Sequence, residues 1–294
     1  MVAAVRDGGA PTIEYDALID LANRNNSHTL LHELATVSGK PGLRILEVGC
    51  SSGYLGASLM AKGHHVTGVE PDPGSARVAS GVLAQVWNGG LDDYFAAHPD
   101  ARFDVLIFGD VLEHMLDPVA ELRRALAHLA PGGHVAISLP NVAHGSVRAM
   151  MLSGRFDYHD RGILDRTHLR FFTRGSIAQM LADAGLALDC MFQVSVPVDA
   201  VGTEYAMALD RELVTAVELL SDNDPSGHAF QYVLLARPST LPHAALVQAN
   251  DAVPVEITAP LRAPRGSRSV WDRLKVALFR RLLKSISARR FRAR

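Results

Sequence analysis

The sequence has few cysteines and no long apolar run, and both scarcities narrow the class of protein. Two cysteines, Cys50 and Cys190, occur among 294 residues, and they form no C-x-x-C pair. A disulfide scaffold and a zinc ribbon are therefore excluded, and a reducing cytoplasm is the expected compartment. No stretch reaches eighteen uninterrupted apolar residues, so we expect no membrane-spanning helix. Residues 1–16 also lack the charged head and apolar run of a secretory signal.

The net charge of −2 conceals an uneven distribution of charge along the chain. Positions 1–261 contain 17 basic and 30 acidic residues, a net charge of −13. Positions 262–294 contain 12 basic residues and one acid, a net charge of +11. The acidic body argues against a broad nucleic-acid footprint, so nucleic acid is not an expected partner of the main domain. The basic end indicates an anionic partner for that segment alone.

Short apolar runs alternate with amphipathic stretches between about residues 40 and 237. Runs suited to buried strands lie at 43–48, 65–70, 103–110, 134–140, 188–196 and 230–236. Helical patterns lie between them at 54–63, 75–86, 117–130, 173–184 and 210–220. This alternation predicts parallel βαβ units and a doubly wound α/β sheet. With 294 residues, 48% of them hydrophobic, the chain can bury a sizeable core and fits either one large domain or one domain plus an appendage.

The chain after residue 237 has a different composition. Residues 238–268 contain five prolines and show little helical pattern, so this segment is expected to be a linker. Residues 269–294 then form a basic pattern of helical period, with Trp271 and several leucines on one face. Such a helix can lie in an anionic membrane interface, so we expect peripheral attachment at the inner membrane. Docking of this tail on the acidic body and nucleic-acid binding are the alternatives.

A glycine-rich turn follows the first buried run, in the string LEVGCSSGYLG (46–56). Gly49 and Gly53 lie between a strand and a helix, where glycine lets the backbone turn sharply and approach a ligand. The spacing differs from the G-x-G-x-x-G of dinucleotide sites, and no G-K-[ST] follows. Taken alone, this turn is equally consistent with a plain strand-to-helix connection.

Two acids near the turn indicate the ligand. Glu70 ends the second run, about twenty residues after the turn, where a carboxylate can accept hydrogen bonds from both ribose hydroxyls. Glu47 precedes the turn, and its carboxylate suits an ammonium or sulfonium while repelling a pyrophosphate. A nucleoside with a positively charged tail is therefore predicted, namely S-adenosylmethionine (SAM).

Four strings together resemble the class I SAM-dependent methyltransferases: LEVGCSSGYLG, GVEPDP, FDVLIFGDVLEH and LAPGGHVAISLPN. The resemblance covers about residues 13–237. The continuation GRFDYHDRGILDRTHLRFFT (154–173) resembles a bacterial methyltransferase-domain subgroup, many of whose members accompany glycan-modifying enzymes. This subgroup is similar to the ubiquinone-type O-methyltransferases.

The resemblance implies a Rossmann-like, seven-stranded sheet with strand order 3-2-1-4-5-7-6 and an antiparallel last strand. It supplies the third strand, near Val86–Asn88, and makes 41–237 the methyltransferase domain. It also makes 1–40 a helical lid that packs over the cofactor. The alternative for the string Arg24–His28 is an ordinary helix start capped at Ser27.

Cofactor contacts follow from the same resemblance. It implies that Glu47, Gly49 and Gly53 contact the methionine moiety and that Glu70 binds the ribose. The loop after the fourth strand would flank the methionine end and the sulfonium, through Asp110, Val111, Glu113 and His114.

Adenine recognition departs from the family pattern. The acid that reads the adenine amino group is replaced by Gly90. Either Asp92 substitutes for it, or backbone groups alone hold the adenine.

Transfer of a methyl group to a hydroxyl needs a base that removes the hydroxyl proton. His168 is the first candidate, with Asp165 orienting it or competing for the role, and His144 is the second. The alternative for His168 is a buried imidazole that ties the loop to the sheet. Arg170 and Arg155 are candidate acceptor anchors, although each could instead form a surface ion pair. No metal-ligand spacing such as H-E-x-x-H occurs, so no metal is predicted.

These observations and the resemblance predict a SAM-dependent methyltransferase, and the resemblance implies that its acceptor is a hydroxyl of a sugar or glycan precursor. A quinone-like or other lipid-phase phenol is the alternative acceptor. A SAM-binding scaffold or regulator without turnover is the alternative of another class. The N/D-P-P-Y string of base-modifying methyltransferases is missing after the fourth strand, which argues against a nucleic-acid substrate.

Overall fold

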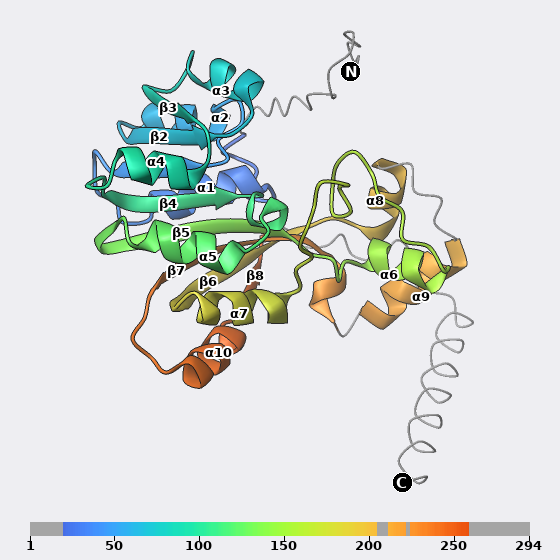
Figure 1. Cartoon of the computed structure of the whole chain (residues 1–294). Helices are drawn as coiled ribbons and strands as arrows, with labels where there is room; N and C mark the ends of the chain where they lie inside the picture. Colours follow the sequence, from blue (N-terminus) through green and yellow to red (C-terminus); the bar gives the residue numbers. More distant parts are fainter. Residues whose placement is uncertain (1–19, 205–210, 222–223, 259–294) are drawn as a thin grey trace.

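The computed structural model describes residues 20–204, 211–221 and 224–258 (Figure 1). Its strands are β1 (Arg44–Val48), β2 (His65–Glu70), β3 (Gln85–Asn88), β4 (Phe103–Gly109), β5 (Leu129–Pro140), β6 (Leu186–Ser195), β7 (Ala229–Pro238) and β8 (Val255–Ile257). Its α-helices are α1 (Ser27–Ala35), α2 (Tyr54–Met60), α3 (Pro73–Ala79), α4 (Leu91–Ala97), α5 (Pro118–Leu126), α6 (Gly145–Leu152), α7 (Arg174–Asp183), α8 (Val198–Glu204), α9 (Arg211–Ser221) and α10 (His243–Ala252). Two 3-10 turns complete the described elements, η1 (Leu112–His114) and η2 (Pro225–Gly227).

The described strands form one sheet in the order β3-β2-β1-β4-β5-β7-β6-β8. Strand β7 runs antiparallel to β5 and β6, whereas β1 to β5 pair in parallel. The predicted doubly wound α/β architecture and its strand order are therefore confirmed. The third strand also lies where the resemblance placed it. An eighth strand, β8, extends the predicted sheet beyond β6.

Helices cover both faces of the sheet because its central strands are apolar on both sides. Ile45 and Ile107 pack with α1 and α2 on one face, while Leu46 and Phe108 pack with α4, α5 and α7 on the other. Figure 1 shows α4, α5 and α7 on the near face of the sheet. The ends of β1, β2, β4 and β5 are thereby held in a fixed arrangement.

A small lobe lies beyond the carboxyl ends of the strands, where Figure 1 shows α6, α8 and α9 grouped together. Val147, Met150, Ile163, Leu164 and Val201 form its apolar core. The lobe comes from the segments between β5 and β7. It therefore stands beside the sheet edge at which the predicted cofactor residues meet.

The expected linker at 238–268 is wrong for residues 243–257, which form α10 and β8. Helix α10 packs beside α7 (Figure 1). Pro242 is the N-cap of α10 and Pro254 follows its end, so neither proline lies inside the helix. Prolines at such positions frame a helix rather than exclude one.

The ends of the chain bear on two further predictions. The residue that caps α1 is Asn26 rather than Ser27. The tail at 269–294 and the first part of the lid, residues 1–19, lie outside the described residues. Among the helices that are described, none combines the length and apolarity needed to cross a membrane.

Asn250 fixes α10 to the sheet, and its replacement tests the corrected boundary. Its buried amide accepts a hydrogen bond from the Leu188 N–H at 2.8 Å and donates to the Leu186 carbonyl at 3.0 Å. We expect Asn250→Ala to lower the free energy of unfolding by about 2 kcal/mol, because buried backbone groups lose their partners. Chemical denaturation measures this loss, with the exposed Gln248→Ala as control. Equal stability of the two variants would contradict the docking of α10.

Candidate active site

The turn between β1 and α2 has the backbone geometry that only glycine adopts readily. Gly49 and Gly53 have φ angles of +70° and +82°. A Cβ atom on Gly49 would lie 2.7 Å from Cγ2 of Val111, so a side chain there has no room. Val111 therefore packs directly against the turn, which places the loop after β4 beside the loop after β1.

Glu70 faces this turn from the end of β2. Its Oε2 atom accepts a hydrogen bond from the Ser51 N–H at 2.8 Å, and its Oε1 atom accepts one from the Asp72 N–H at 2.9 Å. Each carboxylate oxygen has a second lone pair, so Glu70 keeps the capacity to accept from ribose hydroxyls. Glu70, the residue predicted to bind the ribose, is therefore held in a fixed position at the edge of the turn.

Glu47 is a buried carboxyl group at the end of β1. Its Oε2 atom has no hydrogen-bond partner among the described residues, and a Cβ atom on Gly56 would lie 2.6 Å from that oxygen. Burial raises the pKa of Glu47 to about 8. A cation in the turn would favour the ionised carboxylate. These residues therefore fit a ligand with a positively charged group.

Asp110 directly follows β4 and has a φ angle of +50°, which is uncommon for a residue other than glycine. Its Oδ2 atom accepts a hydrogen bond from Nε2 of Gln231 at 3.0 Å, and its own N–H donates to Oγ of Ser138 at 3.0 Å. Burial raises the pKa of Asp110, whereas nearby His28 and His168 oppose that shift. The Asp110 side chain therefore lies within electrostatic range of both His28 and His168.

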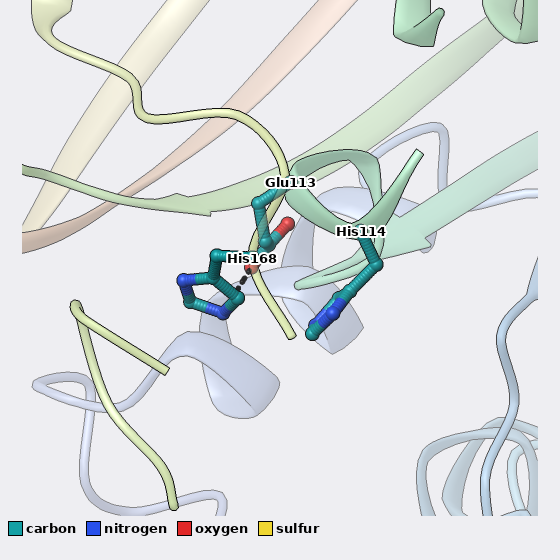
Figure 2. A group of neighbouring side chains, drawn as sticks. All are labelled: Glu113, His114 and His168. Carbon is teal, nitrogen blue, oxygen red and sulfur yellow. Dashed lines mark ion pairs between the residues drawn. The ribbon is translucent and has the colours of Figure 1, made fainter. Parts of the chain in front are cut away.

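Figure 2 shows Glu113, His114 and His168 gathered in one cluster. Oε1 of Glu113 lies 4.0 Å from Nε2 of His168, and the rings of His114 and His168 are 4.7 Å apart. Nδ1 of His168 lies 3.0 Å from the Ile163 carbonyl oxygen and donates to it in the neutral ring, so Nε2 faces Glu113 without a proton. This nitrogen can accept a proton from a hydroxyl.

The electrostatics of the cluster follow from its burial. Burial raises the pKa of Glu113 well above its usual range, and the charge of Asp110 adds to the shift. Burial lowers the pKa of His168, and the neighbouring His114 lowers it further. Burial therefore favours the neutral acid form of Glu113 and the neutral imidazole form of His168.

Backbone contacts join η1 to the loop that carries His168. The N–H groups of Leu169 and Arg170 donate to the Glu113 carbonyl oxygen at 2.8 and 3.0 Å. Asp165 is buried, and its Oδ1 atom accepts hydrogen bonds from the N–H and hydroxyl of Thr167 at 2.8 and 2.7 Å. Asp165 thus shapes the loop before His168.

His144 lies in a different environment and is not available as a base. Its Nε2 atom contacts the Val196 carbonyl oxygen at 2.8 Å and its Nδ1 atom contacts Oγ of Ser146 at 2.8 Å. The side chain is fully buried, and burial lowers its pKa to about 4. His144 instead ties the start of α6 to the end of β6.

The two predicted acceptor anchors and the predicted adenine-binding acid each form a hydrogen bond or ion pair within the protein. Arg170 donates to the Leu116 carbonyl oxygen, and Arg155 forms an ion pair with Asp157. Asp92, the candidate for reading the adenine, pairs with Arg124 of α5. Asp93 lies beside Gly90, since a Cβ atom on Gly90 would be 3.6 Å from its Oδ2 atom.

A metal ion has one candidate location among the described residues. Glu113, His114 and His168 each offer one ligand atom, and these atoms lie within 4.8 Å of one another. Carboxylate and imidazole ligands suit divalent transition metals. The absence of a metal stays a prediction from sequence.

Sequence reasoning placed Glu113 only in the loop beside the sulfonium, without a role toward His168, and it missed the pair formed by His28 and Tyr54. Glu113 stands in the string DVLEH beside His114, so the position was visible but its burial was not. Tyr54 hydroxyl and Nε2 of His28 are 2.7 Å apart, although 26 residues separate them in the chain. No local pattern encodes such a contact.

Comparison with known proteins adds the family. A family model described as a methyltransferase domain matches residues 22–190. "Ubiquinone biosynthesis O-methyltransferase" of Aeromonas salmonicida (strain A449) is 33% identical over 153 residues, which cover 49% of this chain and 63% of that protein. Its namesake from Marinobacter nauticus is 31% identical over 140 residues, 45% of this chain and 56% of that protein. The match therefore spans less than two thirds of either relative.

Solved structures share the fold at low sequence identity. A SAM-dependent methyltransferase from Archaeoglobus fulgidus has a TM-score of 0.50 and 15% identity, covering 74% of this chain and 96% of that one. The O-methyltransferase from a trans-AT PKS multienzyme of Brevibacillus brevis, in complex with S-adenosyl-L-homocysteine, has a TM-score of 0.50 and 13% identity. That match covers 81% of this chain and 86% of the other.

The family model covers more than half of the chain, and its range contains the glycine turn and both acids that frame it. The sheet has the strand order that the resemblance implied. The buried carboxyl group of Glu47 fits a cationic cosubstrate. The chain belongs to the family described as methyltransferase-domain proteins.

Proposed function

We propose that this methyltransferase transfers the methyl group of SAM to a hydroxyl group of a small-molecule acceptor, with His168 as the base. The observation that carries the proposal is the orientation of His168. Its Nδ1 atom forms a hydrogen bond with the Ile163 carbonyl oxygen, and its Nε2 atom lies 4.0 Å from Oε1 of the buried Glu113. A group placed between Asp110 and His168 would meet the donor on one side and the base on the other.

On the donor side, Glu47 and the turn from Gly49 to Gly53 would hold the methionine part, and Glu70 the ribose. The sulfonium would lie near Asp110, whose Oδ1 atom has no partner among the described residues. SAM is already activated for displacement, so the main contribution of the protein is to align donor and acceptor.

On the acceptor side, the hydroxyl oxygen attacks the methyl carbon while Nε2 of His168 takes the hydroxyl proton. A carbon–oxygen bond forms, the carbon–sulfur bond breaks, and its electron pair stays on sulfur to give the neutral thioether. The positive charge of the sulfonium thus reappears on the imidazolium of His168. The carboxyl groups of Asp110 and Glu113 stand close enough to stabilise that charge.

Two acceptor classes are compatible with this chemistry. Our first choice is a hydroxyl of a sugar or glycan precursor, which rests on the string at 154–173. A quinone-like or other lipid-phase phenol is the second, and the names of the relatives in the ubiquinone pathway favour it. A neutral base can deprotonate either hydroxyl, although a phenol depends less on general-base catalysis because its hydroxyl is more acidic. A scaffold that binds SAM without turnover is the alternative of another class.

Transfer of a labelled methyl group from SAM into a bacterial extract tests the function. The extract is separated into lipid, soluble-glycan, protein and nucleic-acid fractions. Label in the glycan or glycolipid fraction supports the first acceptor class, and label in a phenolic lipid supports the second. Label confined to protein or nucleic acid would contradict the proposal. Binding of SAM with no label in any fraction would favour the scaffold.

His168→Ala tests the base in the same assay. We expect the rate of label transfer at pH 7 to fall about 100-fold, the usual scale for losing a general base, with the affinity for SAM unchanged. In the wild-type protein, activity should fall with acidity only below about pH 6.5, because burial lowers the pKa of His168 and the base must be unprotonated.

Two controls accompany the His168 experiment. The exposed His65→Ala should keep the wild-type rate. Treatment with EDTA separates a proton acceptor from a metal ligand, since only the latter role makes the wild-type enzyme lose activity with the chelator. Full activity of His168→Ala would remove the assignment of the base.

We further propose that the basic tail at 269–294 attaches the enzyme to anionic membranes, where lipid-linked acceptors are available. Flotation with vesicles containing anionic lipid compares the full chain with a chain ending at Thr258, which keeps β8 in the sheet. We expect only the full chain to float, and its flotation to decrease with salt. Equal flotation of both chains would contradict the proposal.

A further inference from the structure

Four residues of the segment Arg24–His28 form side-chain hydrogen bonds to other parts of the chain or to the start of α1. The one formed by His28 lies beside the proposed donor site. The Asn25 amide donates to the Ser195 carbonyl and accepts from the Ser195 N–H, both at 2.8 Å, which ties the segment to the end of β6. Asn26 caps α1, accepting from the N–H groups of His28 and Thr29 at 2.9 and 3.2 Å. These contacts fix the start of α1, so the direction of the His28 side chain is set.

His28 reaches the glycine turn through Tyr54, the residue that follows Gly53 and begins α2. The Tyr54 hydroxyl lies 2.7 Å from Nε2 of His28, and the two rings meet edge to face with centroids 4.8 Å apart. Burial lowers the pKa of His28, so the ring is neutral near pH 7. In the tautomer with an unprotonated Nε2, the Tyr54 hydroxyl donates to it.

Asp110 also lies within electrostatic range of His28: the charge of Asp110 raises the pKa of His28, and the charge of His28 lowers the pKa of Asp110. Leu31, one turn further along α1, packs against the end of β4, where a Cβ atom on Gly109 would be 3.1 Å from its Cδ1 atom. The start of α1 is thus positioned between the loop after β4 and the turn after β1. These are the two loops between which the donor's charged centre is expected.

We propose that His28 and Tyr54 are positioning residues for the methyl donor, and that their hydrogen bond closes the donor site on the side of α1. The bond would hold the first turn of α2, and with it the Gly49–Gly53 turn, at a fixed distance from Asp110. The inference rests on the proposed cofactor site.

The pair adds little to the anchoring of α1 itself. Leu30, Leu31 and Leu34 are buried in the core against the sheet, and Asn25 holds the preceding segment. Loss of one partly buried hydrogen bond should therefore change the melting temperature of the unliganded protein only slightly. An ordered contact that surrounds the ligand should instead slow its release.

Isothermal titration of the full chain with SAM tests the pair through a double-mutant cycle. Tyr54→Phe removes only the hydroxyl and His28→Asn shortens the side chain out of reach. We expect each variant to raise the Kd for SAM about fivefold, mainly through faster dissociation, and the double variant to match the weaker single variant, because both remove the same bond. The melting temperature of each unliganded variant should stay within about 2 °C of the wild type.

His32→Asn is the matched control, because it removes another buried imidazole from α1 one turn after His28. It should keep the wild-type Kd for SAM within about twofold, whatever its effect on stability. Three results would each overturn the proposal: wild-type affinity in Tyr54→Phe and His28→Asn, additive effects of the two changes, or an equal loss of affinity in His32→Asn.

Glu70→Ala separates failure of the pair from failure of the proposed cofactor site. Loss of SAM binding in Glu70→Ala, with full binding in Tyr54→Phe and His28→Asn, would reject the pair and keep the site. Wild-type binding in Glu70→Ala would reject the site itself. The exposed Glu256→Gln controls for the general effect of removing an acid.

Discussion

Buried carboxyl groups at the ends of the central strands are the constraint on which the site depends. Glu47, Asp110 and Glu113 each have an oxygen atom without a hydrogen-bond partner among the described residues. Burial of a carboxyl group costs free energy unless it holds a proton or meets a cation. A ligand with a fixed positive charge offsets that cost. The carboxyl groups that lower the stability of the protein without its ligand should therefore increase its affinity for a sulfonium. In the proposed reaction, methyl transfer then moves the positive charge from sulfur toward His168.

The remainder of the fold holds these groups in place. Apolar strands buried on both faces fix the ends of β1, β2 and β4, and the glycine turn brings Val111 against Gly49. The lobe at the carboxyl ends carries the loop of His168, which backbone hydrogen bonds attach to Glu113. The proposed donor and acceptor sides therefore come from different parts of the chain, and the hydrogen bonds from Leu169 and Arg170 to Glu113 join them at η1.

The sequence predicted the parts of this arrangement that local pattern encodes. Apolar runs located six of the eight described strands, the family resemblance supplied β3, and β8 was not predicted. Gly49, Gly53 and Glu70 identified the turn and its acid. Contacts between distant segments were not predictable: Asp92 was expected at the cofactor but pairs with Arg124, and His144 was a candidate base but is enclosed by Ser146 and Val196. Helix α10 was missed because prolines at its ends were taken as signs of a linker.

Proton release on SAM binding is the most direct test of the role of the buried carboxyl groups. The pKa of Glu47 is raised to about 8 in the free protein, so the group is mostly protonated at pH 7 and ionises when a cation binds beside it. Calorimetry in buffers of different ionisation enthalpy should detect release of nearly one proton per SAM at pH 7, falling to about half a proton near pH 8 and to little above about pH 9, and little release in Glu47→Gln at pH 7. Binding of SAM without proton release, or with equal release in Glu47→Gln, would contradict the account.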